Sequence, residues 1–233
     1  MKILAADSSS VSAAAAVCED EKIIAEGFIN NGLTHSQTLL PLIKSTMSCS
    51  GTKYDDIDLF SVTTGPGSFT GVRIGVSTVK GLAFAANKPC VSVSSLEAIA
   101  RTVASFCGII CAVMDARRNQ VYNALFKSSG SQESFERLCE DRALAIEELL
   151  EQLYRDYPDK PIYLVGDGTA LTASFDEKGL LISVPESLRF PRGFAIAAAA
   201  LECYRRGEIL SSESLNPVYL RASQAERELH GGA

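Results

Sequence analysis

Several residue patterns that mark common kinds of active site are missing from this chain. Only two histidines occur, His35 and His230, and none of the seven cysteines forms a Cys-x-x-Cys pair. No cluster of His, Cys, Asp and Glu has the spacing of a metal site. A catalytic nucleophile needs an adjacent base, and His35 is the only credible base of that kind. The sequence therefore argues against a metal-dependent or triad-based hydrolase.

Long apolar runs and basic clusters are also missing. No stretch approaches the roughly 18–20 apolar residues that span a bilayer, and Asp7 comes too early for a signal peptide. The net charge is -6 and no run is basic, which disfavours general nucleic-acid binding although a local patch stays open. The scattered single cysteines suggest buried free thiols in a reducing compartment. We therefore expect a cytoplasmic protein.

The first half of the chain predicts the order strand, strand, strand, helix, strand, helix, strand, helix. The predicted strands are Lys2–Ala6, Val11–Cys18, Lys22–Ile29, Asp58–Thr63 and Cys90–Val93, and the predicted helices are His35–Met47, Ser68–Asn87 and Ser94–Ser105. The first three strands follow one another directly, so we expect them to be antiparallel.

The second half repeats this order loosely. Its predicted strands are Gly108–Met114, Gln120–Phe126, a short one near Arg137–Ala143, Pro161–Val165 and Leu180–Ser183, and its predicted helices are Ile146–Tyr154, a short one after Gly168, and Gly193–Arg206. Two such halves indicate a duplicated α/β unit. Sequence identity between the halves is negligible, so this prediction depends on element order alone.

The run from Gly65 to Gly75 joins a strand, a glycine turn and a helix, which is a geometry that can hold phosphate. It matches neither the P-loop nor the Gly-x-Gly-x-x-Gly pattern, so a simple turn with a helix capped by Ser68 or Thr70 is equally consistent. The following helix carries only two charges, Arg73 and Lys80. An apolar helix with three glycines predicts close packing on more than one side, against its own sheet and against another chain.

Two further turns are candidates for binding. Asp7-Ser8-Ser9 ends the first strand and could hold a metal or a phosphate, or could simply bond its own backbone. Asp115-Ala116-Arg117-Arg118 occupies a predicted hairpin turn, where Arg117 and Arg118 either contact an anion or RNA or are only solvated.

Taken together, these motifs resemble a known family. Its features are Asp7-Ser8-Ser9, Thr34-His35-Ser36, the run from Gly65 to Gly75, the run from Asp115 to Tyr122, and Pro217-Val218-Tyr219-Leu220-Arg221. In this order and spacing they are similar to the Gcp-like, M22 glycoprotease-like family, in the bacterial branch that serves tRNA threonylcarbamoyladenosine biosynthesis. The resemblance extends to about Ala225.

The resemblance implies an actin-like ATPase fold of the sugar-kinase and actin class, with two ribonuclease-H-like lobes of mixed sheets flanked by helices. We assign residues 1–105 to the first lobe, completed by 207–225, residues 106–206 to the second lobe, and residues 226–233 to a flexible tail. On this interpretation Asp7, Ser8, Ser9, Gly65, Gly67 and Ser68 are a candidate vestige of a nucleotide or phosphate site.

The resemblance also implies a role without catalysis. The family's catalytic relative, TsaD, transfers a threonylcarbamoyl group to adenosine 37 of tRNAs that read codons beginning with A. It carries two metal-binding histidines where this chain has Ser95 and Ile99. We therefore expect no catalytic residue, metal or cofactor of its own here, with ATP and a divalent metal on the partner subunits.

The expected partners are TsaD and the ATPase TsaE, with tRNA contacted indirectly through the complex, a homodimer when TsaD is absent, and no membrane. The expected partner surface is a helix pair, formed by His35, Leu39, Leu40, Ile43, Met47, Gly71, Val72, Gly75, Val76 and Val79. Arginine at Val72 or Gly75 is predicted to weaken TsaD binding and to leave the fold intact. The rival functions are a stand-alone ATP-binding kinase or ATPase and an M22-type peptidase.

Overall fold

The first lobe is built on a five-stranded mixed sheet. A computed structural model describes residues 1–221. The sheet contains β1 (Lys2–Asp7), β2 (Ala13–Glu19), β3 (Lys22–Ile29), β4 (Leu59–Gly65) and β5 (Cys90–Ser94). Its strand order is β3-β2-β1-β4-β5, with β1, β2 and β3 antiparallel and with β4 and β5 parallel to β1. The prediction of three consecutive antiparallel strands is confirmed.

The second lobe repeats this topology. Its strands are β6 (Cys107–Asp115), β7 (Gln120–Ser129), β8 (Glu136–Arg137), β9 (Arg142–Ala145), β10 (Ile162–Val165) and β11 (Leu181–Ser183). The order β11-β10-β6-β7-β8 is the order of the first sheet read from the other edge, so the duplicated unit is confirmed. The predicted third strand is wrong in detail because it forms two pieces, β8 and β9, that pair separately with β7.

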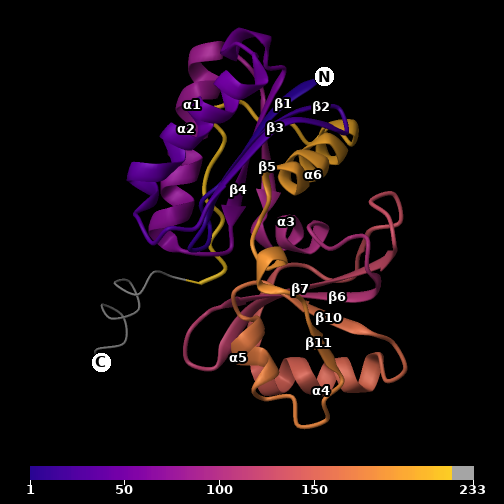
Figure 1. The fold of residues 1–233 in the computed structure, drawn as a ribbon. Coiled ribbons are helices and arrows are strands. Elements are labelled where there is room, and N and C mark those ends of the chain that lie inside the picture. Colours follow the sequence, from indigo (N-terminus) through magenta and orange to yellow (C-terminus); the bar gives the residue numbers. More distant parts are fainter. Residues whose placement is uncertain (222–233) are drawn as a thin grey trace.

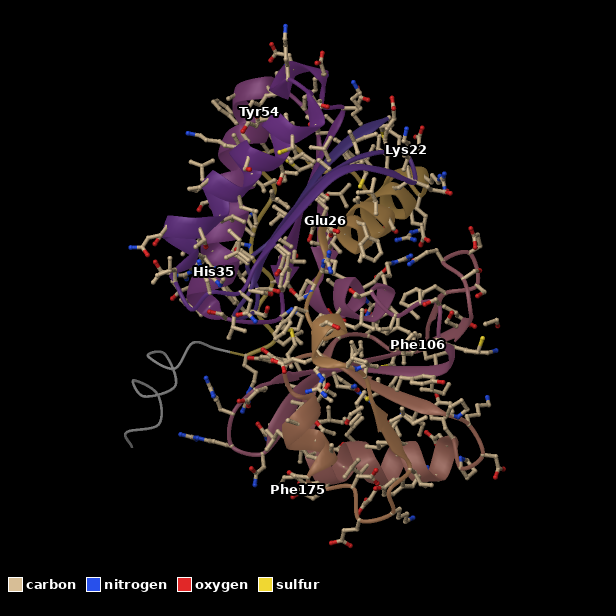
Figure 2. All side chains as sticks on the ribbon, viewed as in Figure 1. Lys22, Glu26, His35, Tyr54, Phe106 and Phe175 are labelled. Carbon is tan, nitrogen blue, oxygen red and sulfur yellow. The ribbon has the colours of Figure 1, made fainter. Side chains whose placement is uncertain are left out.

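Helices cover both sheets (Figure 1). On one face of the first sheet lie α1 (His35–Ser50), the short η1 (Tyr54–Asp56) and α2 (Phe69–Ala86), and the second lobe carries α4 (Ile146–Asp156), α5 (Thr169–Ala173) and η2 (Glu186–Leu188). Tyr54 and Phe175 pack against the outer cores of the two lobes and mark opposite ends of the molecule (Figure 2). None of the helices in residues 1–221 combines the length and hydrophobicity needed to cross a membrane.

Helix α6 (Gly193–Arg205) corrects the predicted lobe boundary. It lies within 106–206, yet it packs on the first sheet, where Ile196 and Ala200 join Ile3 and Ala5 in one core. A Cβ placed on Gly193 would lie 2.6 Å from that of Ala16, so the small residues of α6 allow an approach that larger ones would block. Helix α3 (Ser95–Arg101) contributes to the core of the second sheet in turn.

The C-terminal segment from 207 to 221 lies along the first lobe, as predicted for 207–225. Leu210 exchanges backbone hydrogen bonds with Cys90, and Leu215 is fully buried in the core beneath α2. Lys80 donates from Nζ to the carbonyl oxygens of Glu213 and Leu215. A second element that covers α2 is therefore this segment of the same chain. The tail 226–233 lies outside the described residues.

An ion pair with a buried arginine joins the lobes. Arg101 on α3 is 2% exposed and donates from Nη1 and Nη2 to the carboxylate of Glu202 on α6. Arg101 also pairs with Glu97, which pairs in turn with Arg137 of the second lobe. Burial alone would raise the pKa of Glu97, but the charges of Arg101 and Arg137 hold that pKa below its usual value. This network fixes how α3 sits between the two sheets.

Candidate functional site: a cavity between the lobes

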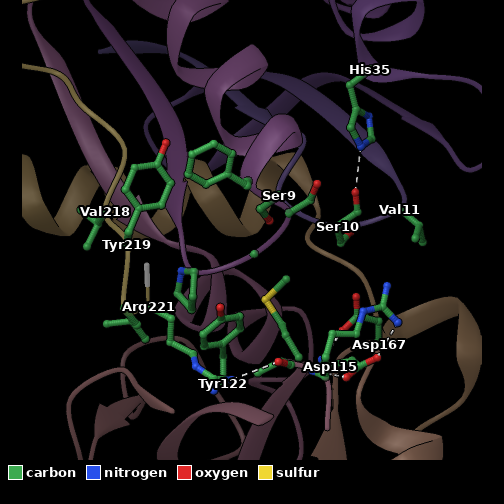
Figure 3. A pocket seen from close by; sticks show the side chains of 18 of the residues that line it. Ser9, Ser10, Val11, His35, Asp115, Tyr122, Asp167, Val218, Tyr219 and Arg221 are labelled. Atoms are coloured by element: carbon green, nitrogen blue, oxygen red, sulfur yellow. Dashed lines mark hydrogen bonds and ion pairs between the residues drawn. The ribbon is translucent and has the colours of Figure 1, made fainter. Parts of the chain in front are cut away.

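A cavity of about 740 Å³ lies between the lobes, where the carboxyl ends of parallel strands from both sheets meet. From the first lobe, Ser9 and Ser10 follow β1, and Pro66 to Phe69 follow β4. From the second lobe, Asp115 ends β6 and Asp167 follows β10. Figure 3 shows the two sets of side chains facing each other. Ligands of α/β sheets bind at this edge of parallel strands, so the cavity is the strongest candidate site.

The serine loop after β1 and the glycine turn after β4 are packed against each other. The amide of Ser68 donates to the carbonyl oxygen of Ser9, and the Ser8 hydroxyl donates to the carbonyl oxygen of Gly71. A Cβ added at Gly67 or Gly71 would collide with these loop carbonyl groups. Ser68 caps α2 by accepting from the Gly71 amide, so the predicted cap is confirmed. Glycine is needed here for close backbone contact.

Asp7 lies behind this loop and is fully buried. Its Oδ1 accepts hydrogen bonds from the amide and hydroxyl of Ser9, at 3.0 and 2.6 Å, and from the Thr63 hydroxyl at 2.5 Å. Its Oδ2 has no partner. Burial raises the pKa of Asp7, and the hydrogen bonds from Ser9 and Thr63 oppose that rise only in part. The carboxyl group organises the loop and is not part of the cavity wall.

His35, at the start of α1, holds the same loop from the other side. Its Nε2 lies 2.8 Å from the carbonyl oxygen of Ser10, and its Nδ1 is buried without a partner (Figure 3). No serine or cysteine side chain is hydrogen-bonded to this ring within the described part of the chain. His35 therefore acts as a packing residue of the loop.

Two carboxylates and a strained turn form the second-lobe side of the cavity. Asp167 accepts from the amide of Asp115 at 3.2 Å, and burial, with a contribution from the Asp115 charge, raises the pKa of Asp167. The predicted hairpin turn is present, and Arg117, Arg118 and Asn119 all have positive φ, at 67°, 56° and 55°. This left-handed conformation costs about 1–2 kcal/mol for each such residue, so the turn is maintained by contacts.

Those contacts come from both sides of the turn. The Arg117 amide donates to Asp115 Oδ1 at 2.7 Å, and its Nη1 donates to Asp115 Oδ2 at 3.0 Å. Ile146 donates its amide to the carbonyl oxygen of Asn119. Arg221, near the end of the described chain, donates from Nη1 to the carbonyl oxygen of Ala116 (Figure 3). The C-terminal segment thus bridges the two lobes beside the cavity.

The same segment builds an aromatic and basic rim. Tyr219 stacks on Phe69 of α2 with ring centroids 4.8 Å apart, and Arg73 lies 3.8 Å above the Phe69 ring. Arg73 also donates from Nε to the Tyr219 hydroxyl at 2.7 Å. Val218 donates its amide to the carbonyl oxygen of Thr64. These contacts fix the segment across the mouth of the cavity.

The predicted partner surface needs correction. Eight of its ten residues are buried within the first lobe itself, namely Leu39, Ile43, Met47, Gly71, Val72, Gly75, Val76 and Val79. Only His35 and Leu40 reach the surface. Helical periodicity identified the apolar side of each helix correctly, but that side faces the sheet. The prediction that arginine at Val72 or Gly75 leaves the fold intact is wrong, because both residues are buried. Gly75 also lies directly against Ser8 and has no room for a side chain.

The exposed side of α2 has a different composition. Ser77, Gly81 and Ala85 repeat at four-residue spacing and are all exposed, and nothing lies within 4 Å of a Cβ built on Gly81. Phe84 is 68% exposed beside this stripe, and Leu40 of α1 is 38% exposed. The neighbouring outer sides of α1 and α2 therefore present small and apolar residues to solvent.

Positions 95 and 99 lie in the interior. Ser95 is fully buried and its hydroxyl has no partner, while Ile99 packs in the core between α3 and the second sheet. Ser94, rather than Ser95, caps α3 by accepting from the Glu97 amide. Within residues 1–221 no group of three or more His, Cys, Asp and Glu is placed to hold a metal ion.

Comparisons with known proteins agree with this geometry. Residues 31–228 match the family model described as TsaD: tRNA N6-adenosine threonylcarbamoyltransferase. The chain is 31% identical to the tRNA threonylcarbamoyladenosine biosynthesis protein TsaB of Bacillus subtilis, over 97% of this chain and 96% of that protein. It is 31% identical to Escherichia coli TsaB, over 99% of each. A Pseudomonas aeruginosa crystal structure, described as similar to peptidase YEAZ, has a TM-score of 0.81 at 25% identity and covers 94% of this chain and 99% of its own.

Two lobes of one topology around a cavity define an actin-like ATPase fold, in which each lobe is ribonuclease-H-like. The fold class predicted from the sequence is confirmed. Within this class, the chain belongs to the TsaB (YeaZ) family of tRNA threonylcarbamoyladenosine biosynthesis proteins.

The fold class implies a nucleotide, and the residues around the glycine turn fit one poorly. The amides of Ser68 and Gly71 are already used by the chain itself, and Asp7 is separated from the cavity. Of the described residues around the cavity none is lysine, and its two arginines, Arg117 and Arg221, belong to the β6–β7 turn and the C-terminal segment, while two aspartates lie on the wall opposite the glycine turn. The turn and the serine loop close on each other rather than forming an open phosphate cradle.

The sequence correctly predicted that Asp7, Ser8, Ser9, Gly67 and Ser68 lie close together. Gly65 was predicted in the same group, but it packs against the backbone of Val218 in the C-terminal segment. It missed Asp167 and the role of Tyr219. Asp167 had a detectable signal, because it follows a predicted strand as Asp7 and Asp115 do. Tyr219 had no such signal in the sequence, because its stacking on Phe69 joins residues that are 150 positions apart in the chain.

Proposed function

We propose that this chain is a non-catalytic partner subunit in tRNA threonylcarbamoyladenosine biosynthesis, which binds TsaD and organises it for reaction together with TsaE. The observation that carries the proposal is that Ser95 and Ile99, at the positions where the resemblance to TsaD implies two metal-binding histidines, are buried in the interior. A buried isoleucine offers no ligand atom, and a single buried hydroxyl is a poor ligand for a transition metal. The scaffold of the enzyme is kept while its ion-binding side chains are replaced.

The docking surface that we propose is the outer side of α1 and α2. The stripe of Ser77, Gly81 and Ala85 allows a partner helix to approach closely, and Phe84 and Leu40 add apolar area. A related subunit with a similar helix pair can form a pseudo-twofold heterodimer there, and a second copy of this chain can form a true twofold dimer when TsaD is absent. On this proposal the chain acts in the cytoplasm and needs no bound cofactor.

The test is reconstitution with TsaD, TsaE, ATP and a tRNA substrate. We expect modified adenosine to form only when this chain is present, and the isolated chain to show no ATP turnover. Formation of product without the chain, or turnover by the chain alone, would contradict the proposal.

A surface variant tests the docking side separately. Gly81→Arg adds a long charged side chain at an open position, so we expect loss of TsaD binding with a melting temperature that is not lowered. Gly81→Ala is the matched control, because it adds one methyl group at the same place. If TsaD binds Gly81→Arg as it binds the wild type, this surface is not the docking site.

A further inference from the structure

Four arginines and an exposed tyrosine form a strip beside the cavity, and three of them, Arg117, Tyr219 and Arg221, line it. The strip begins at Arg73 on α2, passes through Tyr219 and Arg221 in the C-terminal segment, and ends at Arg117 and Arg118 in the β6–β7 turn. Hydrogen bonds join Arg73 to Tyr219 at 2.7 Å and Arg221 to the Ala116 carbonyl oxygen at 3.1 Å, and Leu220 connects Tyr219 to Arg221 in the sequence. The strip thus crosses from one lobe to the other.

The strip is rich in positive charge, although the protein as a whole is acidic. The whole chain has a net charge of -6, whereas among the described residues the carboxylates that line the cavity beside the strip are Asp115, which is paired with Arg117, and Asp167, which is exposed. Among residues 1–221, no ion pair engages Arg73, Arg118 or Arg221. The Arg117 side chain is 86% exposed even though it contacts Asp115. Within residues 1–221, the four arginines of the strip therefore outnumber the two carboxylates beside it.

The geometry of the turn keeps these cations exposed. Three consecutive residues with positive φ, Arg117 to Asn119, are an unusual conformation for residues other than glycine. Strained backbone of this kind concentrates at binding and catalytic sites, where surrounding contacts maintain it. Arg118 and Asn119 at the tip are both exposed.

The tyrosine of the strip favours an anionic ligand that also carries aromatic rings. Tyr219 is 43% exposed, and its ring is held in place by Phe69 and Arg73. A fixed aromatic ring beside arginines is the arrangement on which unpaired nucleic-acid bases stack while cations contact the phosphates. We infer that the strip from Arg73 through Tyr219 and Arg221 to Arg117 and Arg118 binds a single-stranded segment of RNA, such as a tRNA loop. The inference builds on the proposed function, since it gives this chain a direct contact with the substrate of the complex.

The first experiment measures RNA binding by the full chain. An unstructured RNA oligonucleotide is titrated by fluorescence anisotropy at several salt concentrations. We expect Arg117→Gln/Arg118→Gln to weaken binding on the order of tenfold at low salt and to reduce the slope of log K against log salt by about 1.4. Arg117→Lys/Arg118→Lys should restore most of the affinity. Arg155→Gln, on the exposed surface of α4 and paired only with Asp156, is the matched control and should bind as the wild type does.

Two further outcomes overturn the inference. The first is that the Gln double variant binds RNA as tightly as the wild type does. Failure of the wild type to bind RNA at low salt has the same consequence. The second is that poly-glutamate displaces the labelled RNA as effectively as unlabelled RNA does. Poly-glutamate carries negative charge without bases, so this result would show a surface that binds anions in general. Tyr219→Leu keeps apolar contact with Phe69 but removes the stacking ring, and we expect it to weaken RNA binding without changing the salt slope.

The second experiment separates this inference from the proposed function. In the reconstituted complex, the Gln double variant should raise the KM for tRNA while kcat and TsaD affinity stay unchanged. Loss of TsaD affinity instead would make the strip a protein-docking surface and would overturn the inference. If wild-type chain neither binds TsaD nor supports modification, the proposed function fails, and the anisotropy result on the isolated chain still decides the RNA contact.

Discussion

Arg101 and Glu202 form a two-point ion pair that ties α3 to α6, with Nη2 of the arginine 2.6 Å from Oε2 of the glutamate. The arginine is almost completely buried, and Glu97 shares the same guanidinium. Glu202 is 36% exposed and keeps its contact with Arg206, and Glu97 keeps its pair with Arg137, so removal of the arginine leaves neither carboxylate unpaired. Hydrogen bonds to charged groups contribute about 1.5–3 kcal/mol, and we therefore expect Arg101→Met to lower the free energy of unfolding by about that amount in urea titration.

The matched control for that variant is Arg206→Met. Arg206 pairs with Glu202 and Glu208 at the surface, and exposed pairs contribute about 0–1 kcal/mol. A similar loss of stability in both variants would show that the ion pair between α3 and α6 contributes no more than a surface pair.

Asp7 should make stability depend on pH in a defined direction. Burial raises its pKa in the folded state, so its contribution to stability is fully present below the unfolded pKa of about 3.9 and is lost as pH rises through the folded pKa. Asp7→Asn accepts the same three hydrogen bonds and does not titrate. We expect it to be at least as stable as wild type at pH 7, with an advantage that grows above about pH 4.

Asp7→Ala provides the contrast at the same position. It leaves the Ser9 amide and the Ser9 and Thr63 hydroxyls without their acceptor, at a cost of about 3 kcal/mol or more. Thermal unfolding at a series of pH values checks both variants. An alanine variant as stable as the asparagine variant would show that these hydrogen bonds do not hold the serine loop.

Glycines at two positions of α2 should respond oppositely to alanine. A methyl group at Gly71 collides with the carbonyl oxygen of Ser8, whereas Gly81 has open space. We expect Gly71→Ala to destabilise the fold by more than 1 kcal/mol, and Gly81→Ala to stabilise it by about 0.5–1 kcal/mol through helix propensity. Denaturant titration measures both, and the same sign in the two variants would contradict the packing described here.

Tyr219 should control the order of the C-terminal segment. Tyr219→Ala removes the ring stacked on Phe69 and the acceptor of Arg73. Aromatic stacking contributes about 0.5–1.5 kcal/mol, so we expect the Val218 amide to exchange its hydrogen about three- to tenfold faster, with little change in global stability. Tyr219→Phe keeps the ring and should change exchange less. Unchanged exchange in the alanine variant would show that Val218 and Leu215 hold the segment unaided.

Local patterns in the sequence determined the order and type of nearly every helix and strand, the duplicated unit, the Ser68 cap and the hairpin turn at Arg117, because these depend on residues only a few positions apart. Tertiary structure alone decided which sheet α6 covers and what lies over α2. It also decided that Asp167 is hydrogen-bonded to the Asp115 amide and that Arg221 is hydrogen-bonded to the Ala116 carbonyl oxygen. Those contacts join residues far apart in the chain. Hydrophobic periodicity shows that a helix has a face to bury, but the partner that buries it is chosen by the packing of the whole fold.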